Sequence, residues 1–199
     1  MNIKTSIIKH VAKAGTVRPR DLKALGADPS WLHRLAKDGD LERVGRGLYR
    51  LAHAEVSLQV SLAELSKQMP SGVVCLQSAL NFHEIGTQMP NEIWMAVPPG
   101  KWTPACPVWR LRVLRFSGAA YSEGIENHTI DGVPVKLYGV AKTVADCFKF
   151  RHKIGLDIAL EALREGWRAR RFTMDELWHY AKVCRVARVM QPYLESLHE

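Results

Sequence analysis

The apolar positions of residues 1–52 predict a helix, a turn and a second helix at the start of the chain. Residues 3–14 carry apolar side chains at the three- and four-residue spacing of one helical face, and Gly15 ends this segment. Pro19 has a fixed φ that suits a first helical turn, so it opens a second helix, which Gly26 closes.

A third helix and a hairpin complete this region. Asp28 as N-cap and Pro29 in the first turn predict where the third helix begins. Residues 41–51 then place apolar and polar side chains alternately on either side of Gly45-Arg46-Gly47, which predicts two strands around a tight basic turn. A hairpin after helix-turn-helix is the element order of a winged helix-turn-helix, and we assign that domain to residues 1–52.

The rest of the chain predicts a connecting helix at 53–70 and an α+β domain at 71–199. The predicted elements of this domain are a helix at 76–85, strands at 92–97 and 108–116, a hairpin at 127–138, and helices at 140–148, 156–163, 173–184 and 189–197. The expected fold class is therefore α+β: an N-terminal winged helix-turn-helix domain, then an α+β domain with a small sheet and a C-terminal helical bundle.

Composition excludes several classes of protein. Hydrophobic residues make up 47% of the 199, yet no apolar run approaches the roughly 18 to 20 residues of a membrane helix. The N-terminus lacks the unbroken apolar region and cleavage site of a signal peptide, so we expect a cytoplasmic protein. Four widely spaced cysteines predict buried free thiols and no metal site, and no motif indicates a cofactor: Cys75, Cys106, Cys147 and Cys184.

Charge is distributed unevenly along the chain. Residues 1–52 hold eleven Lys and Arg against five Asp and Glu, which is +6 of the total net charge of +8. A basic excess concentrated in one small domain indicates a polyanionic partner.

The third predicted helix supplies the first set of candidate DNA contacts. Leu32 and Leu35 occupy its core side, so the opposite side faces the major groove if the segment is a recognition helix. The fork of Arg34 matches O6 and N7 of guanine. Packing of Trp31 over the junction with the second helix is as reasonable as stacking on a sugar. The outward set is Ser30, Trp31, His33, Arg34 and Lys37.

Further basic candidates lie outside this helix. Arg43 and Arg46 flank the turn glycines, and Arg46 at the tip suits a minor groove. Arg18 and Arg20, at the start of the second helix, suit phosphates. Two other lysines, Lys9 and Lys13, are equally well explained as solvated surface. The alternative for the whole segment is a winged helix used for protein contact, but helix caps, turn glycines and outward charges together favour DNA.

Two stretches resemble a known family. Residues 10–51, with Gly15-Thr16-Val17-Arg18-Pro19-Arg20-Asp21-Leu22 and Leu41-Glu42-Arg43-Val44-Gly45-Arg46-Gly47-Leu48-Tyr49, resemble the N-terminal domain of AbiEi-family antitoxins, the regulators of type IV toxin–antitoxin modules linked to phage abortive infection. Residues 138–150, Tyr-Gly-Val-Ala-Lys-Thr-Val-Ala-Asp-Cys-Phe-Lys-Phe, are similar to the strand-to-helix segment of that family's second domain.

The resemblance implies a two-part function. The winged helix would repress its own operon by binding inverted repeats in double-stranded promoter DNA. The second domain would neutralise a nucleotidyltransferase-like toxin without forming a stable complex. The resemblance further implies a regulator rather than an enzyme.

The alternative function is a nucleic-acid- or nucleotide-modifying enzyme that the winged helix targets. A metal-dependent nuclease needs several carboxylates around one ion, and no tight acidic motif, P-loop or nucleophile motif occurs. An ion pair of Asp146 with Lys142 or Lys149 is the favoured role of that carboxylate, and arginines suit the end of a helix. The candidates are His83, Glu84, His128, Asp131, Lys142, Asp146, Lys149, Arg168, Arg170 and Arg171.

Overall fold

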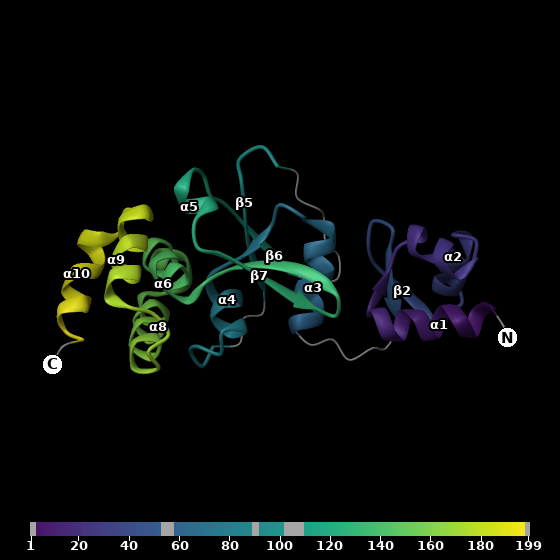
Figure 1. Cartoon of the computed structure of the whole chain (residues 1–199), viewed down its shortest axis with the longest axis horizontal. Helices are drawn as coiled ribbons and strands as arrows, with labels where there is room; N and C mark the ends of the chain where they lie inside the picture. The colour runs from purple at the N-terminus through teal and green to yellow at the C-terminus, as the bar shows by residue number, and fades with distance from the viewer. Residues whose placement is uncertain (1–2, 53–57, 89–91, 102–109, 198–199) are drawn as a thin grey trace. The chain divides into compact units, whose positions relative to one another are not determined.

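The computed structural model describes residues 3–52, 58–88, 92–101 and 110–197, and these form two compact units (Figure 1). Within the described ranges, unit 1 comprises residues up to Pro70 and the segment 129–134; unit 2 comprises 71–101, 110–128 and 135–197. Helices occur in both units, and the strands form two sheets, so the predicted α+β class is confirmed.

Unit 1 contains the predicted helices and hairpin, with differences at the helix ends. Its elements are α1 (Ile3–Ala14), β1 (Thr16–Val17), the 3-10 helix η1 (Pro19–Leu25), α2 (Ser30–Lys37), β2 (Leu41–Gly45), β3 (Leu48–Leu51) and α3 (Leu58–Gln68). The second predicted helix is the 3-10 helix, and α2 begins one residue after Pro29. Residues 53–57 of the predicted connecting helix lie outside the described residues.

The helices of unit 1 pack over a three-stranded sheet of order β1-β3-β2. The two-residue strand β1, which the sequence pattern did not predict, pairs antiparallel with β3. β2 and β3 form the predicted antiparallel hairpin, with an irregularity of register between Arg43 and Gly45. Fully buried apolar side chains from α1, η1 and α2 form the core, among them Ile7, Val11, Leu22, Leu32 and Leu35.

Unit 2 alternates short strands with helices before its helical C-terminal part. Its elements are β4 (Val73–Val74), α4 (Leu76–Phe82), β5 (Ile93–Val97), β6 (Leu111–Arg115), α5 (Ala119–Ser122), β7 (Ile125–Ile130), β8 (Val133–Tyr138), α6 (Val140–Lys149), α7 (Arg151–Ile154), α8 (Leu156–Arg168), α9 (Met174–Val183) and α10 (Ala187–Glu195). The end of β7 and the start of β8 belong to the segment 129–134 of unit 1. β4, α5 and α7 are additions to the predicted elements, and residues 108 and 109 of the predicted strand at 108–116 lie outside the described residues.

The second sheet has the order β6-β5-β4-β8-β7. Its central strand, β4, is two residues long and pairs antiparallel with β5 and parallel with β8. β5 and β6 run parallel, in register from Ile93 opposite Leu111 to Val97 opposite Arg115. The sheet is therefore mixed, with parallel pairs that need chain crossovers between them.

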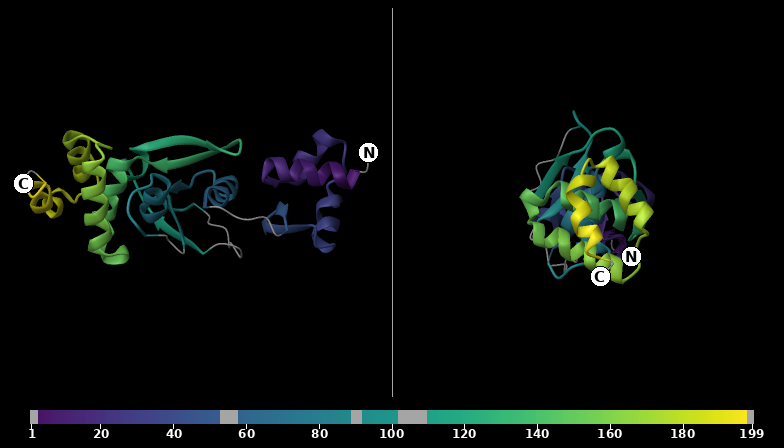
Figure 2. Two further views of the ribbon diagram at one scale, coloured as in Figure 1. Left: turned by 90° about the horizontal axis from the view of Figure 1, so that it is seen from below. Right: turned by 90° about the vertical axis from the view of Figure 1, so that its left-hand side faces the viewer.

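Helices α6 to α10 gather at one end of the second sheet, as the two views of Figure 2 also show. α6 packs against α4, α8 and α9, and every residue from Val140 to Phe148 is buried. The predicted capping box opens α9: the Thr173 hydroxyl accepts from the Glu176 N–H, and the Glu176 carboxylate accepts from the Thr173 N–H. The core of unit 2 thus combines one sheet face with the buried α6.

Candidate nucleic-acid interface

The exposed face of α2 carries the predicted contact set. Leu32 and Leu35 are fully buried, so α2 is oriented with its opposite side toward solvent. Four of the five predicted side chains are exposed, and Trp31 is half-buried. The exposed ones are Ser30, His33, Arg34 and Lys37.

The start of α2 is fixed by a side chain outside the helix. Asp28 Oδ1 accepts a hydrogen bond of 2.8 Å from the Ser30 N–H. The hydrogen bonds from Ser30 lower the pKa of the Asp28 carboxyl below its usual value, because they stabilise the charged form. Asp28 therefore satisfies one of the free N–H groups at the helix start, although Pro29 rather than Asp28 directly precedes the first helical residue.

Trp31 packs inward and supports Arg34. Its ring contacts the buried core of unit 1, as expected if it packs over the helix junction. The Arg34 guanidinium lies over the same ring, 5.3 Å from its centroid. A cation placed over an indole is attracted by the ring's negative face. Arg34 is thereby held along the exposed face of α2.

Both arginines of the hairpin are exposed, but one of them makes a hydrogen bond to the turn. The Nε of Arg43 donates to the Gly45 carbonyl at 3.1 Å, so this side chain folds back on the turn. Arg46, at the tip, is exposed. Gly47 has a φ of +64°, in the left-handed region that favours glycine. The turn therefore depends on Gly47 to present Arg46.

Arg18 and Arg20 occupy different environments at the start of η1. Arg20 is exposed, whereas Arg18 is half-buried and its guanidinium donates to the Lys67 carbonyl at the end of α3. Lys67 in turn donates to the Thr16 hydroxyl at 2.6 Å, and burial lowers the pKa of its amine. These contacts tie the end of α3 to β1 and η1, so Arg18 holds the unit together in addition to its predicted role.

The sequence pattern gave no indication that Arg50 is buried. This side chain on β3 is 6% exposed and forms ion pairs with Glu42 on β2 and Glu64 on α3. Because Glu64 comes from a helix fourteen residues later, only the tertiary structure reveals the pairing. Arg50 therefore belongs to the interior of unit 1 and not to its basic surface.

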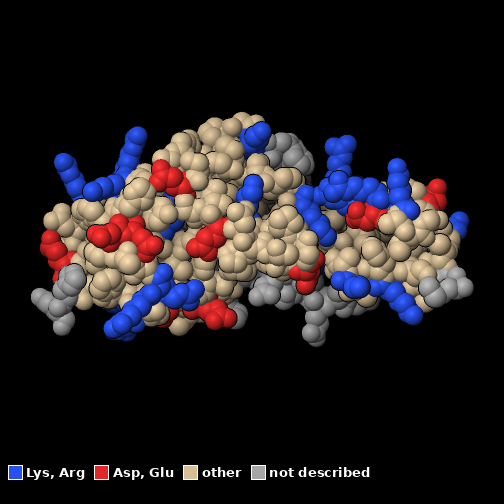
Figure 3. All heavy atoms as spheres, viewed as in Figure 1, with Lys and Arg blue, Asp and Glu red and all other residues tan. Residues whose placement is uncertain are grey.

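Many of the Lys and Arg side chains that make unit 1 basic lie on its surface. In the view of Figure 3, Lys and Arg side chains project from unit 1 over α1, α2 and the hairpin. Lys4 is partly neutralised by Asp40, at 2.6 Å, and the hydrogen bond raises the pKa of its amine. An exposed cationic surface around a helix whose core side is fixed has the properties of a nucleic-acid interface.

The alternative enzymatic candidates in unit 2 do not converge on one site. Lys142 and Asp146 are both fully buried and form an ion pair of 2.5 Å, the pairing predicted between these two residues. Asp146 also accepts from the Cys184 thiol at 3.1 Å. Burial raises the pKa of the Asp146 carboxyl, and Lys142 opposes this shift. Their place inside the core, behind the continuously buried α6, gives them a structural role.

The two histidines among the candidates make local contacts. The imidazole Nε2 of His83 lies 2.9 Å from the Tyr138 carbonyl and, because a carbonyl only accepts, donates to it. Burial lowers the pKa of His83. His128 Nε2 lies 3.1 Å from the carboxylate of Glu126. Across the described ranges, no three His, Cys, Asp or Glu side chains come together to hold a metal ion.

Other candidates are dispersed over both units. Glu84 and Asp131 are exposed residues with positive φ, at +58° and +48°, and Asp131 belongs to unit 1. Lys149 lies over the rings of Phe116 and Phe150, at 5.8 and 5.9 Å. The remaining candidates line a cavity at the end of α8: Arg168, Arg170 and Arg171.

The cysteines behave as predicted where the structure describes them. Cys75, Cys147 and Cys184 are free and buried, and burial raises the pKa of each thiol, that of Cys184 to about 12. Cys106 lies outside the described residues. The three described thiols are thus poor nucleophiles at neutral pH.

Sequence comparison finds a family match within unit 1. Residues 7–52 match the family model described as "Transcriptional regulator, AbiEi antitoxin". This segment is similar to the AbiEi antitoxins. The match confirms the predicted resemblance over the region that contains α2 and the hairpin, and the AbiEi family is one of DNA-binding antitoxin regulators.

Structural comparison extends the similarity over most of the chain. The crystal structure of the Rv2827c protein from Mycobacterium tuberculosis matches with a TM-score of 0.66 and 14% sequence identity, covering 90% of this chain and 71% of that one. At this identity the match shows a shared fold. No curated protein matches the sequence.

Within the described ranges, no helix combines the length and the apolar character needed to cross a membrane.

Proposed function

We propose that this chain is a DNA-binding antitoxin that represses its own toxin–antitoxin operon and neutralises the toxin that the operon encodes. Unit 1 acts as a winged helix-turn-helix, with α2 in the major groove and the β2–β3 hairpin as the wing. The observation that carries the proposal is the exposed cationic face of α2 within the segment that matches the AbiEi antitoxins.

The contact chemistry assigns distinct roles to the basic residues. Arg34, supported by Trp31, reads a guanine edge through its bidentate fork. Arg46 at the hairpin tip enters the minor groove, and Lys37, Arg20 and Arg43 contact phosphates. Ser30 and His33 add hydrogen bonds to bases or phosphates. Arg18 contributes chiefly by holding η1 against Lys67.

The second part of the proposal concerns the toxin. The resemblance of residues 138–150 to that family's second domain supports a neutralising function in the domain after residue 70, directed at a nucleotidyltransferase-like toxin with which no stable complex forms. The protein would act in the cytoplasm on double-stranded promoter DNA that carries inverted repeats.

A promoter reporter and a toxicity assay test the two parts together. The full-length Arg34→Gln/Arg46→Gln variant should lose repression of a reporter driven by the chain's own upstream region. The same variant should still rescue growth when the neighbouring toxin gene is expressed, because both substitutions are exposed and leave the second domain unchanged.

Lys13→Gln is the matched control for charge. It removes an exposed cation from α1 of the same unit, outside α2 and the hairpin. Repression should be nearly unchanged in this variant. Equal loss of repression in Lys13→Gln and in the double variant would reject the assigned interface, and full repression by the double variant would reject DNA binding through α2 and the hairpin.

A further inference from the structure

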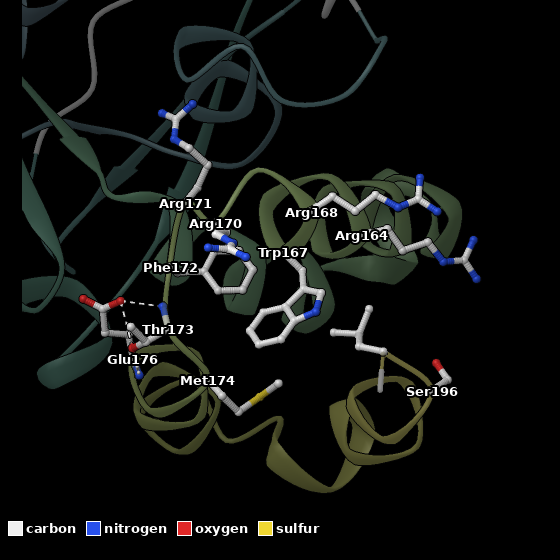
Figure 4. A pocket seen from close by; sticks show the side chains of 11 residues that line it. Arg164, Trp167, Arg168, Arg170, Arg171, Phe172, Thr173, Met174, Glu176 and Ser196 are labelled. Carbon is white, nitrogen blue, oxygen red and sulfur yellow. Dashed lines mark hydrogen bonds between the residues drawn. The ribbon is translucent and has the colours of Figure 1, made fainter. Parts of the chain in front are cut away.

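Unit 2 contains a cavity that the proposed DNA binding does not use. Its volume is about 1090 Å³, slightly above the roughly 300–1,000 Å³ typical of small-molecule sites. It lies between the end of α8, the connection to α9, and the residues after α10 (Figure 4). One part of its lining is apolar and the other is cationic.

The apolar part is built from aromatic and sulfur-containing side chains. Trp167 is half-buried, and its indole lies in the middle of the cavity with Met174 close by in Figure 4. Phe172 is 7% exposed, and its ring centroid lies 6.4 Å from that of Trp167. Leu197 completes this floor. Such a surface suits a flat aromatic group, because aromatic rings and methionine sulfur pack favourably against one another.

Three exposed arginines form the cationic part. Arg164 and Arg168 are four residues apart on α8, and Figure 4 shows their side chains extending side by side. Like charges at this spacing destabilise a helix, so their pairing has a cost that a bound anion would offset. Arg170 is the third, and its φ of +51° is unusual for a residue other than glycine.

Arg170 stands where a helix end normally favours glycine. The N–H of Arg170 donates to the Trp167 carbonyl at 3.0 Å, and the N–H of Arg171 donates to the Gly166 carbonyl at 2.9 Å. These two bonds define a Schellman motif, whose left-handed residue is Arg170. The chain therefore carries a long cationic side chain beside the cavity at a position where its backbone is strained.

The acidic side chains near these arginines hydrogen-bond to other groups. Glu161 accepts from Thr87, and Glu165 accepts from the Gly86 N–H. Glu176, the acid in the cavity lining, caps α9. Among the described residues, no carboxylate lies within ion-pair distance of Arg164, Arg168 or Arg170.

Arg171 differs from the other three. Its Nη1 donates to the His83 carbonyl at 3.1 Å, and in Figure 4 its side chain points away from the aromatic floor. It fastens the connection between α8 and α9 to the end of α4, and so helps to shape the cavity without offering its charge to a ligand.

We propose that this cavity binds a nucleotide, with the base against Trp167 and the phosphates held by Arg164, Arg168 and Arg170. Guanidinium groups match phosphate oxygens through paired hydrogen bonds, and an indole is a stacking platform for any base. Three arginines around one opening suit the closely spaced charges of a phosphate chain better than the separated carboxylates of an acidic peptide. The inference does not depend on DNA binding by unit 1.

The test is calorimetric titration of the full-length protein with ATP, GTP, CTP and UTP, each in magnesium-free buffer. At least one should bind with a saturable 1:1 isotherm, and it should bind about tenfold or more tightly than its nucleoside or inorganic tripolyphosphate, because each of these lacks one half of the contacts. Equal binding of tripolyphosphate would overturn the proposal in favour of a simple polyanion site. Absence of a saturable isotherm for all four nucleotides would also overturn it.

Variants connect the binding to this cavity. Arg164→Gln/Arg168→Gln should weaken nucleotide binding about tenfold or more, because it removes two charge-assisted contacts. Arg188→Gln, an exposed arginine on α10 outside the cavity lining, is the control and should bind like the wild type. Equal binding by both variants would reject the site. The arginine pair is exposed, so this test leaves the half-buried Trp167 and its packing unchanged.

Two further measurements test whether the bound nucleotide is free or the end of an RNA strand, and whether nucleotide binding is independent of DNA binding by unit 1. Competition with a 5′-phosphorylated single-stranded RNA oligonucleotide separates free nucleotide from a strand end: the stronger competitor identifies the source, and both outcomes keep the nucleotide chemistry. Operator binding by Arg164→Gln/Arg168→Gln should equal that of the wild type. Failure of the DNA-binding proposal would leave the nucleotide isotherm unchanged, so the two proposals fail separately.

Discussion

The guanidinium of Arg34 lies over the indole of Trp31, 5.3 Å from the ring centroid, on the solvent-facing side of α2. Trp31 thus contacts the core of unit 1 on one side and Arg34, a predicted base contact, on the other. Because the two residues are three apart on one helix, the indole restricts where Arg34 can point. Arg34 should therefore lose less conformational entropy on binding DNA than an unrestricted arginine would.

Replacing Arg34 by lysine should separate base recognition from charge. Arg34→Lys keeps the positive charge but loses the bidentate fork, so affinity for the operator should fall by about 1–3 kcal/mol, while the salt dependence of binding stays the same. Fluorescence anisotropy with operator and scrambled duplexes at several salt concentrations measures both quantities. Lys13→Arg on α1 is the control. An operator affinity equal to the wild type would contradict the role given to Arg34.

The hairpin turn should be sensitive to a side chain at Gly47. Its φ of +64° penalises any residue with a Cβ, so Gly47→Ala should lower the free energy of unfolding by about 1–2 kcal/mol. Gly47→Asn should cost less, because asparagine tolerates the left-handed region better. Urea unfolding of the three proteins tests the order glycine, asparagine, alanine. Equal stability of the alanine and asparagine variants would argue against this conformation of the turn.

The buried pair of Lys142 and Asp146 should be essential to the fold. Asp146→Ala leaves a buried ammonium without its partner and should cost about 3–5 kcal/mol of stability, whereas Lys142→Met/Asp146→Leu should cost less because no charge is left in the core. Lys153→Met, at an exposed position on α7, is the control for loss of a lysine. A fully stable Asp146→Ala that fails to neutralise the toxin would instead assign Asp146 a direct functional role.

Burial of His83 should make unit 2 less stable in mild acid. Burial lowers the pKa of its imidazole below 6.5, so the unfolded chain takes up a proton at a pH where the folded chain does not. His83 therefore favours the folded state above pH 6.5, and that contribution falls progressively as the pH drops from 6.5 through the lower folded-state pKa.

The pH dependence of urea unfolding measures this effect. His83→Gln keeps a donor for the Tyr138 carbonyl and should reduce the loss of stability between neutral and mildly acidic pH. His152→Gln, which replaces an exposed histidine on α7, should leave the dependence of the unfolding free energy on pH unchanged. The role given to His83 is contradicted if the unfolding free energies of His83→Gln and the wild type depend on pH in the same way.

Most of unit 1 could be predicted from its sequence because its boundaries are set by local chemistry. Gly15 and Gly26 have positive φ and end their helical segments, and the buried face of α2 follows its helical periodicity. The burial of Arg50 could not be predicted, since its partner Glu64 comes from a different element. Local pattern identifies helices and turns well, but it does not show which charges meet.

Unit 2 was harder to predict for two physical reasons. Val73 and Val74 form the centre of the sheet, yet two residues carry no period that distinguishes a strand from the start of a helix. The cavity joins side chains from α8, the α8–α9 connection and the end of the chain. In the sequence Arg164 and Arg168 resemble ordinary helix-surface charges beside Trp167, and only the tertiary structure shows that Met174 and Leu197 close a cavity next to them.

Sequence-specific binding to the operator is the most direct test of the proposed antitoxin function. The purified full-length protein is titrated at about physiological salt onto a fluorescent duplex carrying its own upstream region, beside a scrambled duplex of the same length. We expect the upstream duplex to bind about 10³-fold more tightly, and Arg34→Gln to remove this preference. Equal weak binding to both duplexes, falling steeply with salt, would contradict the account, because it would reduce unit 1 to nonspecific phosphate attraction.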